Sequence, residues 1–304
     1  MDIGYSYPIE MRRNQNKGTA MPKPMVSIIM RSMNDSRYIE RTLSSIMTQT
    51  FRDFELVNVD SGSTDGTYEI VRKYNPTKSK QILPSEYVPG KVLNAAVREC
   101  AGEIVVFNNS DCIPLDSKWL ENLIAPFHSD SQVAATFANQ VPRPDARPLV
   151  AKDNSRAFGD GSVSAKWKHF FSLASSATRK EIVMQQPFDE KIKYSEDVEW
   201  SRRIKGHGWK IAYAPAARVE HSHNYTLREV MKRFYNEGLA EGRIYGNCPS
   251  FIRGFAIPLL AESSRDFIYL AKKGLIADMP YGAVYRMLQR YYAYRGRKNY
   301  LEQT

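Results

Sequence analysis

Acidic and histidine side chains gather at four points of this sequence, and each cluster could act on a charged ligand. Asp60 opens the loop "DSGSTDGT", where a carboxylate can accept hydrogen bonds from a nucleobase or ribose while glycines let the backbone approach it closely. Asp111 follows the run "EIVVFNNS" and could hold a divalent cation, with Asn109 as a neutral oxygen donor on the same turn. His221 and His223 could complete such a cation site.

The fourth cluster is the acid pair Glu196 and Asp197, at the start of the segment "EDVEWSRRIKG". A carboxylate near a crevice is the standard general base for activating a hydroxyl group. Ordinary structural explanations exist for every cluster, because Ser63, Thr64 and Asp65 are good helix caps and acids are favoured at helix N-termini. A histidine pair is also common at a protein surface. The residue types alone leave these alternatives open.

Elements that could position these clusters alternate along the first half of the chain. The segments predicted as strands are "VSIIM" (26–30), "FELVNV" (54–59), "QIL" (81–83), "EIVVF" (103–107) and "VAATFA" (133–138). Residues at helical spacing between them are Ile39, Leu43, Ile46 and Met47, then Ile70, Val71 and Tyr74, then Leu93, Ala96, Val97 and Cys100. This alternation predicts a parallel sheet with helices on both faces, whose ligands lie beyond the strand carboxyl ends.

The two strand-end clusters are expected to share one crevice. Asp60 follows one predicted strand and Asp111 follows another, so both should face the carboxyl edge of the sheet. His221 and His223 lie one residue apart in a strand-like segment, which would point both rings to the same side.

Composition limits the class of protein. The chain has 304 residues, of which 42% are hydrophobic and 25% charged, as expected of a globular protein with one large α/β domain and an appendage, or with two smaller domains. Three scattered cysteines fit neither a disulfide framework nor a zinc site, which favours a reducing, cytoplasmic setting. Residues 1–24 are polar and aperiodic, so we expect a flexible leader rather than an export signal.

A formal net charge of +10 invites anionic partners. These could be nucleic acid, a phosphate-bearing substrate or an acidic membrane face, and charge alone does not choose among them. No basic, aromatic-interleaved motif of the common nucleic-acid-binding modules occurs, so we expect no nucleic-acid partner. The longest apolar stretch near the C-terminus, "FIRGFAIPLLAE", contains Arg253 and is too short to span a membrane.

The order and spacing of several motifs resemble the family 2 glycosyltransferases, which are inverting enzymes of the GT-A fold. The matching segments are "VSIIMRSMN", "VDSGSTDGT", "GKVLNAAVRECAGEIVVFNNSD", "SEDVEW" and "VEHSH". The resemblance covers about residues 25–235 and implies a GT-A catalytic domain, with a mixed, mostly parallel sheet. Residues 236–304 would then form a basic helical C-terminal extension.

The resemblance also implies a role for each candidate site residue. It implies that Asp197 is the catalytic base and that Asp111 with His221 and His223 binds a divalent cation, Mn²⁺ or Mg²⁺. Glu196 and Trp200 would contact the acceptor. The residues implied in donor binding are Ser32, Asp60, Lys91, Asn109 and Asp111. Two positions depart from the family pattern: Asn109 stands where an aspartate is usual, and Arg31 with Ser32 stand where Pro-Thr is common.

Within the family, "NSDCIPLDSKWLENL", "QVPRPDARP" and "HSHNYTLREVMKRF" are similar to rhamnosyltransferase-type members that build bacterial surface polysaccharides. The expected reaction moves a sugar from dTDP-rhamnose or a UDP-sugar to an acceptor hydroxyl. The alternative is a noncatalytic nucleotide- or glycan-binding module on the same fold, because a fold does not guarantee chemistry.

The C-terminal region is rich in cations interleaved with Tyr, Phe and Leu, as expected of a surface that rests on anionic lipid. The alternative is a solvated basic face packed on the catalytic domain. On the first interpretation the acceptor is lipid-linked and the protein lies at the inner face of the plasma membrane. The cations concerned are Arg228, Lys232, Arg233, Arg243, Arg253, Lys272, Lys273, Arg286, Arg290, Arg295, Arg297 and Lys298.

Overall fold

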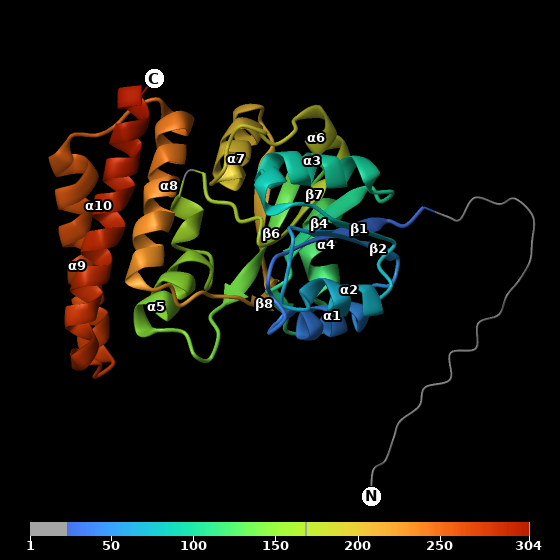
Figure 1. The fold of residues 1–304 in the computed structure, drawn as a ribbon, viewed down its shortest axis with the longest axis horizontal. Coiled ribbons are helices and arrows are strands. Elements are labelled where there is room, and N and C mark those ends of the chain that lie inside the picture. The colour runs from blue at the N-terminus through green and yellow to red at the C-terminus, as the bar shows by residue number, and fades with distance from the viewer. Residues whose placement is uncertain (1–22, 168, 304) are drawn as a thin grey trace, which may run out of the picture.

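A computed structural model describes residues 23–167 and 169–303, and Figure 1 shows an α/β body followed by a helical end. Nearly all of the predicted leader, residues 1–24, lies outside the described residues. The body is built on an eight-stranded sheet of order β3-β2-β1-β4-β7-β6-β8-β5. Its strands are β1 (Val26–Ser32), β2 (Phe54–Asp60), β3 (Lys78–Gln81), β4 (Ile104–Asn109), β5 (Ile113–Pro114), β6 (Val133–Val141), β7 (Ser175–Arg179) and β8 (Lys210–Glu220).

Strand register brings the predicted strand-end clusters to one edge of the sheet. β1 runs parallel to β2 and to β4, with Ser32 opposite Asp60 and Arg31 opposite Asn109. β7 is antiparallel to both of its neighbours, while β6 and β8 are parallel. The mixed, mostly parallel sheet predicted from the sequence is therefore confirmed.

Side chains of β1 alternate between two hydrophobic cores, one on each face of the sheet, as the period of a strand requires. Val26, Ile28 and Met30 pack with α1, α2 and α4, whereas Ile29 packs with α3, α6 and α7. The helices of the body are α1 (Ile39–Met47), α2 (Thr67–Lys73), α3 (Pro89–Glu99), α4 (Trp119–Ser129), α5 (Pro148–Ala157), α6 (Lys180–Gln185) and α7 (Glu196–Gly206). Helices thus cover both faces, as predicted.

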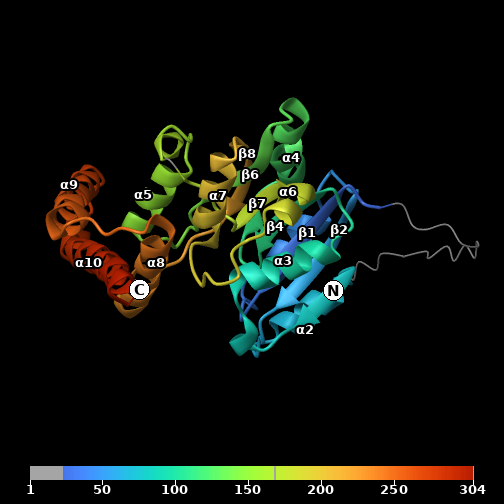
Figure 2. The ribbon, with the colours of Figure 1, turned by 90° about the horizontal axis from the view of Figure 1, so that it is seen from above.

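Three long helices, α8 (Leu227–Tyr245), α9 (Ile257–Lys272) and α10 (Met279–Gln303), form the C-terminal end of the molecule (Figure 2). α8 and α10 pack closely because a glycine of each helix faces the backbone of the other helix. A Cβ atom on Gly238 would lie 2.1 Å from the oxygen of Ala293, and one on Gly296 would lie 2.1 Å from the oxygen of Tyr235. The boundary expected at residue 235 falls inside α8, so the helical region starts at Leu227.

Buried ion pairs join this helical region to the body. Asp266 of α9 pairs with Arg286 of α10, whose Nε lies 2.7 Å from the carboxylate, and with Lys152 of α5. Arg286 also pairs with Asp153 of α5. Removing one partner of such a buried network is strongly destabilising, so these pairs hold α5, α9 and α10 together. Within residues 23–303 no helix has the length and hydropathy needed to cross a membrane.

Local boundaries differ from the sequence predictions in three places. The expected strand "QIL" lies mostly beyond β3, which ends at Gln81 and is solvent-exposed throughout. α2 begins at Thr67, ahead of its first predicted residue. β8 ends at Glu220, so His221 and His223 lie in the loop after the strand rather than in it. In each case the hydrophobic periodicity of a short polar segment was too weak to show where the helix or strand begins or ends.

Candidate functional site

Asp60 organises the loop after β2. One carboxylate oxygen accepts hydrogen bonds from the backbone N–H groups of Gly62 and Ser63 and from Gln81 Nε2. The other accepts from the hydroxyl groups of Ser32, at 2.8 Å, and Ser63, at 2.6 Å. Burial acts to raise the pKa of Asp60, but the hydrogen bonds from Ser63, Gln81 and Ser32 hold it below its ordinary value. Ser32 is buried behind this carboxylate, so it supports the loop.

Three side chains predicted to bind a cation converge on one point. Asp111 Oδ2 lies 3.6 Å from His221 Nε2 and 3.5 Å from His223 Nε2, and the two histidine nitrogens lie 3.0 Å apart. Ligands at right angles around a cation, with bonds of about 2.2 Å, are separated by about 3 Å. The triad therefore has the spacing of three ligands on one face of a divalent cation.

Neighbouring groups keep both imidazoles in the form that a metal requires. His221 Nδ1 lies 2.7 Å from Gln140 Oε1, an acceptor, so Nδ1 carries the proton and the Nε2 lone pair faces Asp111. Burial lowers the pKa of His221 to about 4, against the opposing effect of Asp111, and burial also lowers the pKa of His223. Both rings are neutral at pH 7, and neutral imidazole is the ligand form.

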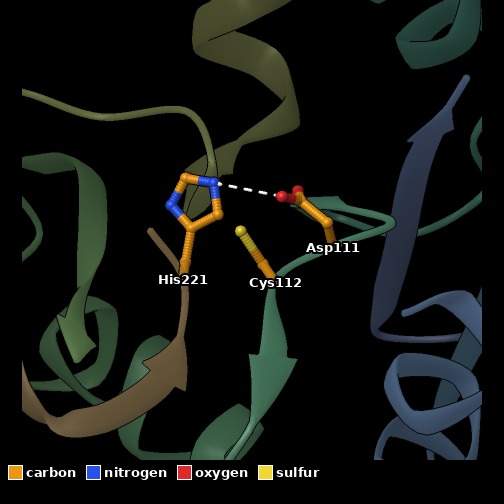
Figure 3. Close-up of side chains that lie close together, drawn as sticks. All are labelled: Asp111, Cys112 and His221. Atoms are coloured by element: carbon orange, nitrogen blue, oxygen red, sulfur yellow. Dashed lines mark ion pairs between the residues drawn. The ribbon is translucent and has the colours of Figure 1, made fainter. Parts of the chain in front are cut away.

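Cys112 lies beside Asp111 and His221 of this triad, as Figure 3 shows. Its Sγ lies within 4.8 Å of the ligand atoms of Asp111 and His221. Burial first, and then the charge of Asp111, raise the pKa of this thiol well above its ordinary value. A protonated thiol is a poor ligand, and thiolate sulfur selects softer metals than Mg²⁺ and Mn²⁺. The residues that fit the cation are thus Asp111, His221 and His223, and a Cys next to an Asp gave no signal in the sequence.

Arg143 is a buried residue of the site that no sequence pattern indicated. Its Nη2 donates to the backbone oxygen of Asp111 at 2.6 Å and approaches Asp111 Oδ2 at 3.3 Å. Its Nη1 donates to the backbone oxygen of Ser222, between the two histidines. The guanidinium lies 3.9 Å above the ring of Tyr38. Arg143 therefore ties together the two loops that carry the triad.

The two departures from the family pattern are in direct contact. Arg31 Nη2 donates to Asn109 Oδ1 at 3.1 Å, and Arg31 Nη1 donates to Glu196 Oε1 and to the Tyr87 hydroxyl, each at 3.2 Å. A guanidinium can only donate, so the amide oxygen of Asn109 must face it. That oxygen was expected to serve a cation. In the structure the amide oxygen of Asn109 accepts a hydrogen bond from Arg31, so the Nδ2 donors point away from Arg31.

Asp197 is half-buried at the start of α7, next to this bridge. α7 begins directly after Ser195, which has a left-handed φ of 59°. Burial, and then the neighbouring charge of Glu196, raise the pKa of Asp197 to about 7, while Arg31 acts in the opposite direction. A carboxylate with a pKa near the working pH is suited to accept a proton and release it again. Glu196 itself is held by Arg31.

Trp200 does not reach the site. Its ring is fully buried and packs against Phe188, with ring centroids 5.3 Å apart, while its Nε1 donates to the backbone oxygen of Gln186 at 2.7 Å. A side chain without exposed surface cannot contact an acceptor. The prediction of an acceptor contact is therefore wrong, because the first turn of α7 faces the crevice while position 200 faces the core.

Two surface hollows flank the triad and the Asp60 loop. Exposed Lys91, at the start of α3, lines a hollow with Gln81 and Glu86 beside β3. A second hollow runs from His223 to α10 and is lined by aromatic rings and Arg147. Its aromatic residues are Tyr225, Tyr281 and Tyr285. The structure thus places Lys91 near the Asp60 loop but does not bring it into contact with the triad.

Comparison with known sequences gives one family and several relatives. The sequence profile described as Glycosyl transferase family 2 matches residues 27–185. O-antigen chain rhamnosyltransferase RfbN of Salmonella typhimurium is 27% identical over 225 residues, which cover 70% of this chain and 71% of that protein. O-antigen chain rhamnosyltransferase WbaN of Salmonella anatum is 32% identical over 204 residues, covering 63% of this chain and 64% of that protein.

Solved structures resemble this fold over most of its length. The mannosyltransferase PcManGT from Pyrobaculum calidifontis, solved with GDP-Man and Mn²⁺, has a TM-score of 0.64 and 20% identity, covering 93% of this chain and 88% of that one. Glucosyl-3-phosphoglycerate synthase from Mycobacterium tuberculosis, solved with Mn²⁺, UDP and phosphoglyceric acid, has a TM-score of 0.55 and 20% identity, covering 73% and 79%. These likenesses confirm the GT-A fold expected from the sequence.

Proposed function

Because this chain belongs to the family 2 glycosyltransferases, we propose that it transfers a sugar from a nucleotide diphospho-sugar to an acceptor hydroxyl, with inversion at the anomeric carbon and with a divalent cation. One observation carries the proposal. The Asp111, His221 and His223 triad and the half-buried Asp197 belong to one connected site, because Arg31 contacts both Asn109, two residues before the triad's aspartate, and Glu196, next to Asp197.

The donor is proposed to be dTDP-rhamnose, with a UDP-sugar as the alternative. Support comes from the relatives in Salmonella, which are named rhamnosyltransferases. Asp60 and Lys91 would hold the nucleoside, and Asp111, His221 and His223 would hold Mn²⁺ or Mg²⁺. When bound, such a cation neutralises charge on the leaving diphosphate.

Asp197 is proposed as the base that accepts the acceptor's proton. The acceptor oxygen forms a bond to the anomeric carbon, the bond from that carbon to the diphosphate breaks, and the hydroxyl proton moves to the Asp197 carboxylate. The released nucleoside diphosphate takes the electron pair of the broken bond. The raised pKa supports this role, because the carboxylate is basic enough to hold the proton during transfer.

Arg31 and Asn109 are proposed to act together toward the diphosphate. An aspartate at position 109 would place a negative charge there. This chain instead has a neutral amide, whose oxygen accepts a hydrogen bond from the Arg31 guanidinium. The Nδ2 donors of Asn109 are then free to face an anionic ligand, which prefers N–H donors to carboxylates. Three ligands would thus suffice for the metal, with phosphate oxygens and water completing its coordination.

The acceptor is proposed to be a lipid-linked glycan that approaches over the surface between His223 and α10, past the small hollow there. Tyrosine rings and Arg147 line that hollow, and aromatic rings present the flat apolar faces against which sugars pack. Glu196 would orient the acceptor only indirectly, through its contact with Arg31. To reach a lipid-linked acceptor the protein would work at a membrane surface, which we propose to be the inner face of the plasma membrane.

A donor screen tests the proposed reaction. Released nucleoside diphosphate is measured for dTDP-, UDP- and GDP-sugars with Mn²⁺, and the anomeric configuration of the product is read by NMR. We expect one preferred donor, inversion, and loss of release in Asp197→Asn but not in the matched surface variant Asp160→Asn, whose carboxylate is fully exposed. A noncatalytic binding module would bind nucleotide yet release no diphosphate from any donor.

A further inference from the structure

Helix α9 turns charged side chains inward and apolar side chains outward, the reverse of an ordinary surface helix. Its inner face carries Glu262 and the buried Asp266, which pair with arginines of α10 and with a lysine of α5. Its outer face exposes Leu260, 68% exposed, and Ile268, 56% exposed. A soluble surface helix normally turns its apolar stripe inward and its charges outward. The outer face of α9 is therefore built to lie against something apolar.

The apolar residues form one continuous stripe. Exposed Arg265 and Lys272 of α9 lie beside an arc in which, at 100° per residue, seven further exposed side chains carry no charge. They are Ile257, Leu260, Ala261, Ser264, Phe267, Ile268 and Ala271. Ile252 before the helix and Ile276 after it are also exposed. Contiguous apolar patches of this kind mark interaction sites.

The charges bordering this stripe identify its partner. Every exposed charged residue between positions 251 and 277 is a cation: Arg253, Arg265, Lys272 and Lys273. A symmetric contact with a second copy would bring these cations together, which disfavours a homodimer. An anionic bilayer surface offers both an apolar layer for the stripe and negative headgroups for its border.

We propose that the outer face of α9 rests on an anionic membrane surface, with Leu260 and Ile268 inserted and Lys272 and Lys273 facing the headgroups. This names the contact surface for the membrane location proposed above, yet it does not depend on the transfer reaction. Several cations expected at this surface do other work. Arg286, Arg290 and Arg297 form ion pairs within the protein. Fewer cations are therefore available to contact lipid than the composition suggested.

The α9 face is held at a fixed angle to the catalytic site. Asp266 anchors it through Lys152 of α5, which belongs to the body. Figures 1 and 2 both place α9 at the end of the molecule away from β1 and β2. A membrane lying on α9 would therefore set the orientation of the hollow that leads to His223.

Vesicle co-sedimentation of the full chain tests the proposal. Vesicles of phosphatidylcholine with about a third phosphatidylglycerol should bind the protein at low salt, and added salt should weaken the binding. Leu260→Glu should weaken it about tenfold or more, because an inserted leucine is replaced by a charge. The matched control is Leu83→Glu in the catalytic body, where the leucine is 64% exposed, and it should bind as the wild type does.

Two further measurements make the test decisive. Lys272→Gln with Lys273→Gln should weaken binding about thirtyfold at low salt, from roughly a fivefold effect per cation. Light scattering should show a monomer for the wild type and for Leu260→Glu. The proposal is overturned if the wild type fails to bind anionic vesicles, if Leu260→Glu binds equally well, or if the wild type is a dimer that Leu260→Glu dissociates. Diphosphate release with a soluble acceptor is scored separately, so failure of either proposal is distinguishable.

Discussion

Replacing Asp197 with asparagine should stabilise the folded protein at about pH 8 and at the same time remove most of its turnover. The native pKa of Asp197 is raised from 3.8 to about 7, so between about pH 4 and pH 7 the native state holds a proton that the unfolded state has lost. The contribution of Asp197 to stability therefore falls as pH rises through this window, while that of His221, whose pKa is lowered to about 4, rises. Above it the full difference in pKa corresponds to roughly 4 kcal/mol, an upper limit because Glu196 shares the titration.

Asparagine keeps the shape of the side chain and cannot ionise, so it avoids this cost. We expect the variant to be about 2–4 kcal/mol more stable than the wild type at about pH 8 and nearly equal to it at about pH 4. Turnover should fall by roughly 10²–10⁴, the range that general-base catalysis supplies. Urea unfolding at both pH values and diphosphate release at saturating donor measure the two effects. A difference in stability between variant and wild type that is the same at both pH values would show that Asp197 ionises freely and refute the reasoning.

Three other predictions follow from the contacts of the site and of the helical region. His221→Ala should weaken Mn²⁺ binding about tenfold or more, measured by the EPR signal of free Mn²⁺, whereas Cys112→Ser should leave it unchanged; equal loss in both would make the thiol a ligand. Arg31→Gln should raise the pH at which activity is half-maximal, because Arg31 lowers the pKa of Asp197, and an unmoved pH profile would contradict this. Asp266→Asn should cost about 3–5 kcal/mol of unfolding free energy by leaving buried cations unpaired, and a change below 1 kcal/mol in urea unfolding would show that the network is dispensable.

The sheet and the proximity of Asp111 to His221 could be predicted because each rests on a pattern within the chain. Hydrophobic period identified β1, β2 and β4, and polar residues after two of them marked the edge where Asp60 and Asp111 lie. His221 lies far from Asp111 in sequence, so only the order of family motifs could bring them together. The structure places their ligand atoms 3.6 Å apart.

Other features depend on tertiary packing that one sequence does not encode locally. Trp200 lies close to the acid pair in sequence, yet the turn of α7 carries it into the core beneath Phe188. Arg143 follows β6 in a segment without a catalytic pattern, and it meets Asp111 only because β6 and β8 are neighbours. The basic composition of the C-terminal region could not show that Arg286 is buried and paired with Asp266.

The continuity of α8 means that the catalytic part cannot be trimmed away from the helical end. Its N-cap is Thr226, three residues after His223, which forms a capping box with Glu229. Its C-terminal half packs against α10 at Gly238. At 1.5 Å per residue the helix is about 28 Å long, so tilting it by ten degrees about its middle would move the His223 end by about 2.5 Å. That is nearly the spacing of the triad itself. A chain shortened at residue 235 would lack the half of α8 that packs against α10 and fixes the position of the helix. We expect this chain to lose its affinity for Mn²⁺ under conditions in which the sheet is still folded.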